Sequence, residues 1–148
     1  MDFKILINNN LDIKSVLDVG AHAGTFTFGC KQFYPEAYYY MIDGNHITEH
    51  YIGNSGIDYK IVYLSNEVKD TIVYKTTYNA FNTGDSLYRE NTNYYSDDKL
   101  LTEQIKTSTL DEIFKNEVTF DFIKIDSQGS EMDIIKGGLE MCKRAKIF

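Results

Sequence analysis

The residues SVLDVGAHAG, at positions 15–24, carry the pattern on which the fold prediction for this chain depends. Positions 16–19 are apolar apart from Asp18 and rich in β-branched valine, which predicts a buried strand. Gly20 and Gly24 follow directly, and glycine suits a tight turn because it adopts backbone angles that side chains resist. A strand that leads into a glycine-bearing turn is typical of nucleotide-binding α/β proteins.

An amphipathic helix and a second strand are predicted after this turn. Phe26, Cys30 and Phe33 recur at the spacing of one helix face, up to a proline that ends the pattern. The next strand is predicted over residues 37–42 and ends at Asp43, about 20 residues beyond the glycines. A carboxylate at that place can accept hydrogen bonds from both ribose hydroxyls of a bound adenosine.

The spacing of the glycines distinguishes between two nucleotide ligands. It reads Asp18-x-Gly20-x-x-x-Gly24 and not Gly-x-Gly-x-x-Gly, so an acidic residue leads the turn. That acid would repel a pyrophosphate placed beside it, but it suits the amino group of a methionine moiety. We therefore expect S-adenosylmethionine, and not NAD, as the ligand.

Composition and charge restrict the class of protein. A chain of 148 residues is long enough for one domain with a real hydrophobic core. Its net charge of −7, without a basic run, argues against nucleic acid as the main partner. Cys30 and Cys142 are expected to be reduced, and no secretory or transmembrane segment is evident. We expect a cytoplasmic protein that has no membrane partner.

The remaining elements follow from local patterns, and their alternation predicts a mostly parallel sheet with right-handed crossovers. Before the middle of the chain they are a lead-in helix within 3–14, a short helix over 46–53, and strands at 59–64 and 71–76, of which the second is antiparallel. A long irregular loop is predicted at about 79–106, and a capping box at Thr109 and Glu112 opens a short helix. A strand over 120–126 and a last helix follow, and the helix has Met132, Ile135, Leu139 and Cys142 on one side. In the capping box, the Thr109 hydroxyl and the Glu112 carboxylate would each accept a backbone N–H.

A histidine pattern in the short helix suggests a metal site less strongly than it suggests a solvated helix. His46-x-x-Glu49-His50 matches the H-x-x-E-H pattern of some zinc peptidases. The segment is short and directly follows a strand, and a third ligand is not evident. We therefore expect no metal.

Several motifs together resemble the FkbM family of S-adenosylmethionine-dependent methyltransferases. Residues 16–24 look like the first motif of the family, NTGDSL at 82–87 like its mid-chain loop, and residues 109–111 like the start of its short helix. The most specific stretch is FIKIDSQGSEMDIIKGG at 122–138. The resemblance covers nearly the whole chain and implies a Rossmann-like class I methyltransferase fold, with a chain that stops at Phe148, where a fifth strand would begin.

The resemblance also implies a reaction and a set of cofactor contacts. The reaction is methyl transfer to the hydroxyl of a sugar or other small molecule. Carried over by position, the methionine end would contact Asp18, Gly20, Ala21 and Gly24. The ribose would contact Asp43, and the adenine would lie beside Leu64, Ser65 and Asn66. His22 lies within the turn, where it either contacts the cofactor carboxylate or serves the turn alone. Asp43-Gly44 stands where the family more often has Glu-Pro.

Three residues in or near the last predicted strand, Lys124, Asp126 and Glu131, are candidates for the acceptor chemistry. Asp18, Asp43 and Asp126 all fall near the carboxyl ends of strands, so we expect them to converge on one crevice. Asp126 is the best candidate to position or deprotonate the acceptor hydroxyl, although it could merely cap a turn. Lys124 should be paired, with Asp126 or Glu131, because an isolated buried ammonium is costly. Glu131 has either a direct role or only a favourable place at a helix start.

Two other functions stay open. A truncated, non-catalytic cofactor-binding or interaction domain is favoured by the absence of further strands after residue 148. An NAD-linked oxidoreductase is disfavoured by the acid that leads the glycine turn. The strand over 120–126 would also be left as a sheet edge unless a partner or the tail covers it, which favours self-association.

Overall fold

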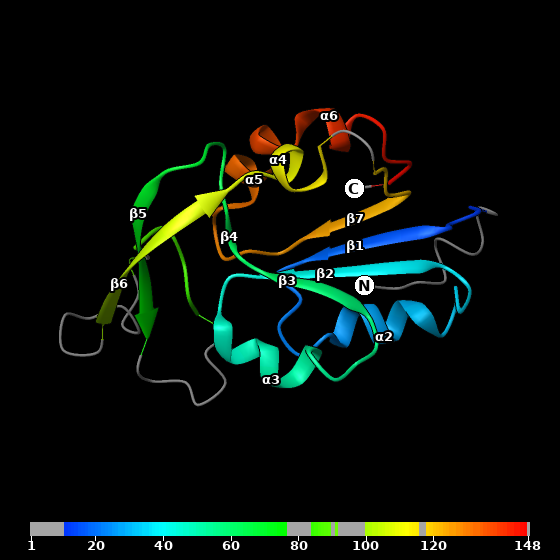
Figure 1. The fold of residues 1–148 in the computed structure, drawn as a ribbon, viewed down its shortest axis with the longest axis horizontal. Helices are drawn as coiled ribbons and strands as arrows, with labels where there is room; N and C mark the ends of the chain where they lie inside the picture. Colours follow the sequence, from blue (N-terminus) through cyan, green and yellow to red (C-terminus); the bar gives the residue numbers. More distant parts are fainter. Residues whose placement is uncertain (1–10, 77–83, 90, 92–99, 116–117, 148) are drawn as a thin grey trace.

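Residues 11–76, 84–89, 91, 100–115 and 118–147 are described by a computed structural model of the chain. The elements, in chain order (Figure 1), are β1 (Ser15–Val19), α2 (Thr25–Lys31), β2 (Tyr38–Asp43), η1 (His46–Thr48), α3 (Glu49–Ile52), β3 (Asp58–Ile61), β4 (Tyr63–Leu64), β5 (Asp70–Thr76), β6 (Leu100–Ser108), α4 (Leu110–Phe114), β7 (Phe122–Ile125), α5 (Glu131–Gly137) and α6 (Leu139–Cys142). Most of the predicted lead-in helix over 3–14 lies outside the described residues.

Four parallel strands form the main sheet, in the order β3-β2-β1-β7. β1 lies inside this sheet, where Val16 is opposite Tyr39 of β2 on one side and Phe122 of β7 on the other. β3 pairs with the outer edge of β2. The parallel α/β arrangement confirms the predicted Rossmann-like fold class.

The two faces of the main sheet carry separate cores, because successive side chains of a strand point to opposite faces. Leu17 packs in one core with residues of α4, α5 and α6. Val16 packs in the other core with residues of α2 and α3. Figure 1 shows these two groups of helices on opposite sides of the sheet. The cysteines Cys30 and Cys142 are free and buried in different cores, as expected for a reduced pair.

A second sheet, with the order β4-β6-β5, lies beyond the carboxyl ends of the parallel strands (Figure 1). β5 and β6 pair antiparallel from Asp70 opposite Lys106 to Thr76 opposite Leu100, as predicted for the first of these strands. The predicted strand over 59–64 is divided: its first part is β3, and Tyr63–Leu64 instead pairs with β6.

The predicted irregular loop at 79–106 is wrong over its last residues, because β6 begins at Leu100. Four successive residues of this strand, 101–104, are exposed, so the sequence shows no apolar alternation there. The backbone ladder to β5 stabilises the strand without such a pattern. Most of the earlier part of the predicted loop lies outside the described residues.

The capping box at the start of α4 is confirmed only in part. The Thr109 hydroxyl accepts the N–H of Glu112 at 3.1 Å. The Glu112 carboxylate, however, accepts the hydroxyl of Ser108 at 2.9 Å and not the backbone N–H of Thr109. The Ser108 hydroxyl thus donates to the Glu112 carboxylate, to which the backbone N–H of Thr109 was expected to donate.

The inner side of the last helix differs from the prediction. Met132 and Leu139, which were expected to be buried, are 63% and 46% exposed. Of the other two predicted residues, Cys142 is buried and Ile135 packs partly buried against the core, as expected. The buried stripe also contains Ile134 and Met141, with Gly137 between them. A Cβ on Gly137 would lie 2.1 Å from the backbone oxygen of Ser65, so this face packs directly on the chain after β4. A pattern of apolar side chains does not reveal this face, because Gly137 at its centre has no side chain.

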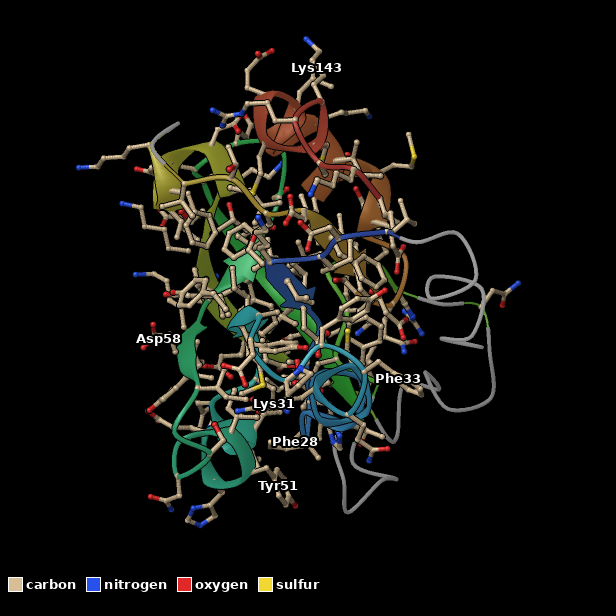
Figure 2. The ribbon with its side chains drawn as sticks, turned by 90° about the vertical axis from the view of Figure 1, so that its right-hand side faces the viewer. Phe28, Lys31, Phe33, Tyr51, Asp58 and Lys143 are labelled. Atoms are coloured by element: carbon tan, nitrogen blue, oxygen red, sulfur yellow. The ribbon has the colours of Figure 1, made fainter. Side chains whose placement is uncertain are left out.

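The predicted stripe of α2 is correct for Phe26, which packs partly buried against the core, and for Cys30, but not for Phe33. Cys30 is buried, but the helix ends at Lys31 and Phe33 lies beyond it, 39% exposed. Figure 2 labels Phe33 together with Phe28, Lys31 and Tyr51 among the side chains on this side of the molecule. Thr27 of α2 is buried although it is not apolar, and its hydroxyl donates to the Asp18 carboxylate at 2.8 Å.

The end of the described chain covers part of the outer edge of β7. Ile147 forms a parallel bridge with Phe122, and its carbonyl accepts the N–H of Ile123 at 3.0 Å. The sequence left open whether a partner or the tail of the chain covers the edge of this strand, and this contact is one with the tail. Self-association through the rest of the edge stays a prediction. Over the described residues, the helices are too short or too polar to cross a membrane.

Candidate functional site

A cavity of about 750 Å³ lies at the carboxyl ends of β1, β2 and β7. This volume falls within the range of small-ligand sites in proteins. The turn after β1, the end of β2 and the loop after β7 contribute one part of the wall, and residues near the second sheet contribute the other. The lining residues with polar or backbone groups of interest are Gly20, Ala21, His22, Asp43, Asn45, Tyr63, Asp85, Ser86, Lys124, Asp126 and Gln128.

The glycine turn passes very close to the backbone after β7. Gly20 has a φ of 72°, and a Cβ placed on it would lie only 1.9 Å from the backbone oxygen of Asp126. The N–H groups of Gly20 and Ala21 both donate to the carbonyl of Ile42, at 2.9 and 3.1 Å. Glycine is therefore required here by the backbone angle and by the lack of space.

Gly24, at the end of the same turn, has a packing role. Its φ is 74°, and an added Cβ would lie 2.8 Å from the Phe28 ring and 3.3 Å from the sulfur of Met41. Gly24 is buried and is not one of the described residues that line the cavity. The structure brings Gly20, Ala21 and His22 to the cavity wall, and it places Gly24 at the start of α2.

The Asp43 carboxylate is held at the cavity wall by two backbone groups. One oxygen accepts the N–H of His22 at 2.8 Å, and the other accepts the N–H of Asn45 at 2.9 Å. Because each carboxylate oxygen has more than one acceptor position, both can still accept a hydrogen bond from a ligand. Asp43 thus fixes the turn and also faces the cavity.

Lys124 pairs with Asp18, which corrects the predicted pairing with Asp126 or Glu131. Its Nζ lies 3.0 Å from Oδ1 of Asp18 and donates to the carbonyls of Gly20, at 2.8 Å, and Val19, at 3.2 Å. Asp18 and Lys124 are direct neighbours in the register of β1 and β7, so their side chains leave the sheet together. The sequence separation of the two residues concealed this pairing.

Asp18 is fully buried and is not one of the described lining residues of the cavity. Its Oδ2 accepts the Thr27 hydroxyl, and its Oδ1 has the Lys124 ammonium as counter-ion but no hydrogen-bond donor among the described residues. The acid that leads the turn is therefore part of an ion pair that ties β1, α2 and β7 together.

Asp126 and Glu131, both near the end of β7, have different surroundings. Asp126 is exposed and lines the cavity, and its N–H donates to the carbonyl of Val19 at 3.1 Å. The Glu131 carboxylate accepts the N–H groups of Ser127 and Gly129, at 2.8 and 3.2 Å. Burial alone would raise the pKa of Glu131, but backbone hydrogen bonds outweigh it and lower the pKa. Glu131 thus shapes the loop that carries Asp126.

Ser65 is buried, with its hydroxyl 3.2 Å from the side-chain oxygen of Asn66. The cavity wall near this point is formed by Val62, Tyr63 and Leu64. Of the predicted adenine border, Leu64 thus lines the cavity, whereas Ser65 and Asn66 are not among its described lining residues.

Asp85 is a lining residue that the sequence analysis did not select. It is half-buried, and the Tyr63 hydroxyl donates to its Oδ2 at 3.4 Å. Burial raises the pKa of Asp85 to about 6, although Lys75 and the Tyr63 hydroxyl act to lower it. The one available signal was its place in the stretch NTGDSL, which the family resemblance had included.

The segment 84–88, which carries Asp85, is anchored on both sides of the cavity. The N–H and carbonyl of Ser86 exchange hydrogen bonds with Tyr74 of β5, at 3.0 and 2.8 Å. The Ser86 hydroxyl donates to the carbonyl of Gln128 at 2.6 Å, and Tyr88 hydrogen-bonds to Asp133 of α5. These contacts fix Asp85 between the second sheet and the loop after β7.

The histidine pattern at residues 46–50 forms η1 and α3, as the predicted short helix. His46 and His50 are exposed. Within the described part of the chain, no group of three or more histidine, cysteine or acidic residues could hold a metal ion.

The fold and the cavity together define an α/β protein of the Rossmann-like class, with a cavity at the carboxyl ends of its parallel strands. The family model described as "Methyltransferase FkbM domain" matches residues 18–147. The chain therefore belongs to the FkbM methyltransferase family and is a methyltransferase, as the resemblance implied. Methyltransferases of this family typically use S-adenosylmethionine. There is no match among curated proteins or among solved structures.

Proposed function

We propose that this chain is an S-adenosylmethionine-dependent O-methyltransferase whose acceptor is a sugar or another small molecule with a hydroxyl group. One observation carries the proposal: Gly20, Asp43 and Asp126, from three different strand ends, line a single cavity of about 750 Å³. In open α/β sheets, ligands bind outside the carboxyl ends of the strands.

The lining residues fit S-adenosylmethionine in size and in chemistry. The Asp43 carboxylate has free acceptor positions for the two ribose hydroxyls. Ile42, Val62 and Leu64 offer apolar wall for an adenine ring. The N–H groups of the turn from Gly20 to His22 already donate within the protein, so the turn offers carbonyl oxygens as acceptors for the amino group of the methionine end. When bound, S-adenosylmethionine supplies a methyl group that its sulfonium makes electrophilic.

Asp126 is the residue best placed to act on the acceptor. Asp126 is exposed and lines the cavity, while its backbone N–H is tied to the carbonyl of Val19. We propose that its carboxylate accepts a hydrogen bond from the acceptor hydroxyl, orients it and receives its proton. Orientation contributes strongly to such a transfer, because the oxygen must approach the methyl carbon in line.

Asp18, Lys124 and Glu131 act through the backbone in this proposal. Lys124 holds the carbonyls of Val19 and Gly20 in place, and Asp18 supplies the counter-charge that keeps this ammonium in position. Glu131 holds the loop after β7 through the N–H groups of Ser127 and Gly129. These residues would preserve the shape of the turn and of the loop on either side of the ligand.

The Asp43→Ala variant tests the cofactor site. We expect a calorimetric titration of the full chain with S-adenosylmethionine to show binding, and this variant to weaken the affinity about 10- to 100-fold, because hydrogen bonds to a charged group contribute roughly 1.5–3 kcal/mol. Asp58→Ala is the matched control, since Asp58 is exposed at the start of β3, at the other end of the strands. We expect NAD not to bind in a parallel titration.

The outcomes separate the three candidate functions. Binding of S-adenosylmethionine, followed by transfer of a labelled methyl group to the hydroxyl of a sugar in an acceptor screen, would support the O-methyltransferase. Binding without transfer to any acceptor would favour a non-catalytic cofactor-binding domain. Binding of NAD alone would support the oxidoreductase and contradict the proposal.

A further inference from the structure

The cavity is strongly acidic. Its described lining includes three carboxylates, those of Asp43, Asp85 and Asp126. The lining also includes the ammonium of Lys124, but this charge is offset by the buried carboxylate of Asp18 at 3.0 Å. No arginine occurs among the described lining residues, and the Lys75 ammonium, which acts on Asp85, forms an ion pair with Glu103.

Asp85 differs from the other two carboxylates because it does not come from the main sheet. The segment 84–88 carries it to the cavity from the side of the second sheet, and the Ser86 contacts with Tyr74 and Gln128 hold it there. The three carboxylates therefore reach the cavity from separate parts of the chain, with Asp43 at the end of β2, Asp126 directly after β7 and Asp85 on the segment 84–88.

The charges around Asp85 leave its carboxylate available to a ligand. The Asp43 carboxylate faces it from β2, the Tyr63 hydroxyl from β4, the Lys75 ammonium from β5 and the Glu103 carboxylate from β6. Lys75 forms an ion pair with Glu103, so its positive charge is shared with that residue. His46, at the start of η1, also acts electrostatically on Glu103.

We propose that the carboxylates of Asp43, Asp85 and Asp126 make the cavity select the positively charged methyl donor over its uncharged product, with Asp85 as a specificity-determining residue. S-adenosylmethionine carries one net positive charge, on its sulfonium, and S-adenosylhomocysteine carries none, while the two differ in shape by one methyl group. Charge is therefore the main physical difference that the cavity can recognise. This inference rests on the proposed function and deepens it.

The selection is expected to depend on pH through Asp85. Because burial raises the pKa of Asp85 to about 6, its carboxyl is mostly ionised at pH 7 and mostly neutral at pH 5. An ionised carboxylate attracts the sulfonium, and this attraction is stronger in a cavity than in water. The preference for S-adenosylmethionine is therefore fully present above the pKa of Asp85 and decreases as the pH falls through it.

The test is a calorimetric titration of the full chain with S-adenosylmethionine and with S-adenosylhomocysteine, at pH 5 and at pH 7. We expect the ratio of the two affinities to be about fivefold larger at pH 7. Asp85→Asn should lower the ratio at pH 7 by a similar factor and remove most of its pH dependence, and Asp85→Glu should restore both. Asp70→Asn, which removes a carboxylate from the exposed start of β5, is the matched control and should change neither.

The outcomes distinguish this inference from the proposed function. If the wild-type chain binds both compounds with a ratio that neither pH nor Asp85→Asn changes, the inference is wrong while the cofactor site stands. An equal effect of Asp70→Asn would also overturn it, because the general charge of the protein would then explain the result. If the folded wild-type chain binds neither compound, the proposed function itself fails.

Discussion

The Lys124→Met variant is expected to lose about 3–5 kcal/mol of unfolding free energy, because it leaves a buried carboxylate without its counter-ion. Asp18 is fully buried, and its Oδ1 lies 3.0 Å from the Lys124 ammonium. The variant also removes the donors to the carbonyls of Val19 and Gly20. Methionine keeps the length and apolar stem of lysine, so the loss reports on charge and hydrogen bonding.

Denaturation by urea, followed by circular dichroism at constant m value, measures this loss. Lys136→Met is the matched control, since Lys136 is 62% exposed and its contact with Asp133 is 3.5 Å long; it should change stability by less than about 0.5 kcal/mol. Adding Asp18→Asn to Lys124→Met should recover a large part of the loss, because the buried charge is then absent. A loss below about 1 kcal/mol in Lys124→Met would show that the ion pair is not an important stabilising contact.

The Gly20→Ala variant is expected to lose about 3 kcal/mol or more and to lose binding of S-adenosylmethionine. Part of the effect is conformational, because a residue with a side chain at a φ of 72° is destabilised by roughly 1–2 kcal/mol. The larger part is steric, since the new Cβ would lie 1.9 Å from the backbone oxygen of Asp126. Neither backbone can stay where it is, so the wall of the cavity must change on both sides.

Gly56 provides a matched control for this experiment. It has the same φ of 72°, but an added Cβ there would meet nothing within 4 Å. Gly56→Ala should therefore show the conformational effect alone, about 1–2 kcal/mol, and should keep the affinity for S-adenosylmethionine. Equal losses of stability and unchanged binding in the two variants would contradict the close approach of the glycine turn to the loop after β7.

The parts of the fold that could be predicted are those with a local pattern. The apolar run 16–19, the glycine turn and Asp43 at the end of the next strand occupy the places that the sequence indicated. β6 was missed, because its exposed residues carry no apolar alternation and its stability depends on pairing with β5. The inner face of α5 and α6 was predicted only in part: Ile135 and Cys142 pack on the core, but Gly137 was missed, because it makes its close contact by having no side chain.

The candidate site was predictable to the same extent. Asp43 and Asp126 lie at the carboxyl ends of parallel strands, which all end at the same edge of the sheet, so their convergence could be inferred. Asp18 was expected in the same crevice but is fully buried and is not among the described lining residues. The partner of Lys124 could not, because Asp18 lies 106 positions earlier in the chain and becomes its neighbour only through the pairing of β1 with β7. Asp85 could not be selected either, since a segment outside the main sheet carries it to the cavity.

For this protein, the linear order of residues was sufficient to define the family, the α/β class and the strand ends that border the cavity. All of these depend on hydrophobic periodicity, turn residues and motifs, which are properties of neighbours along the chain. The register of β1 against β7 and the anchoring of segment 84–88 were needed to find the Asp18–Lys124 ion pair and the third carboxylate of the cavity. These contacts join residues far apart in sequence, and their energies come from burial and charge, which exist only after the chain has folded.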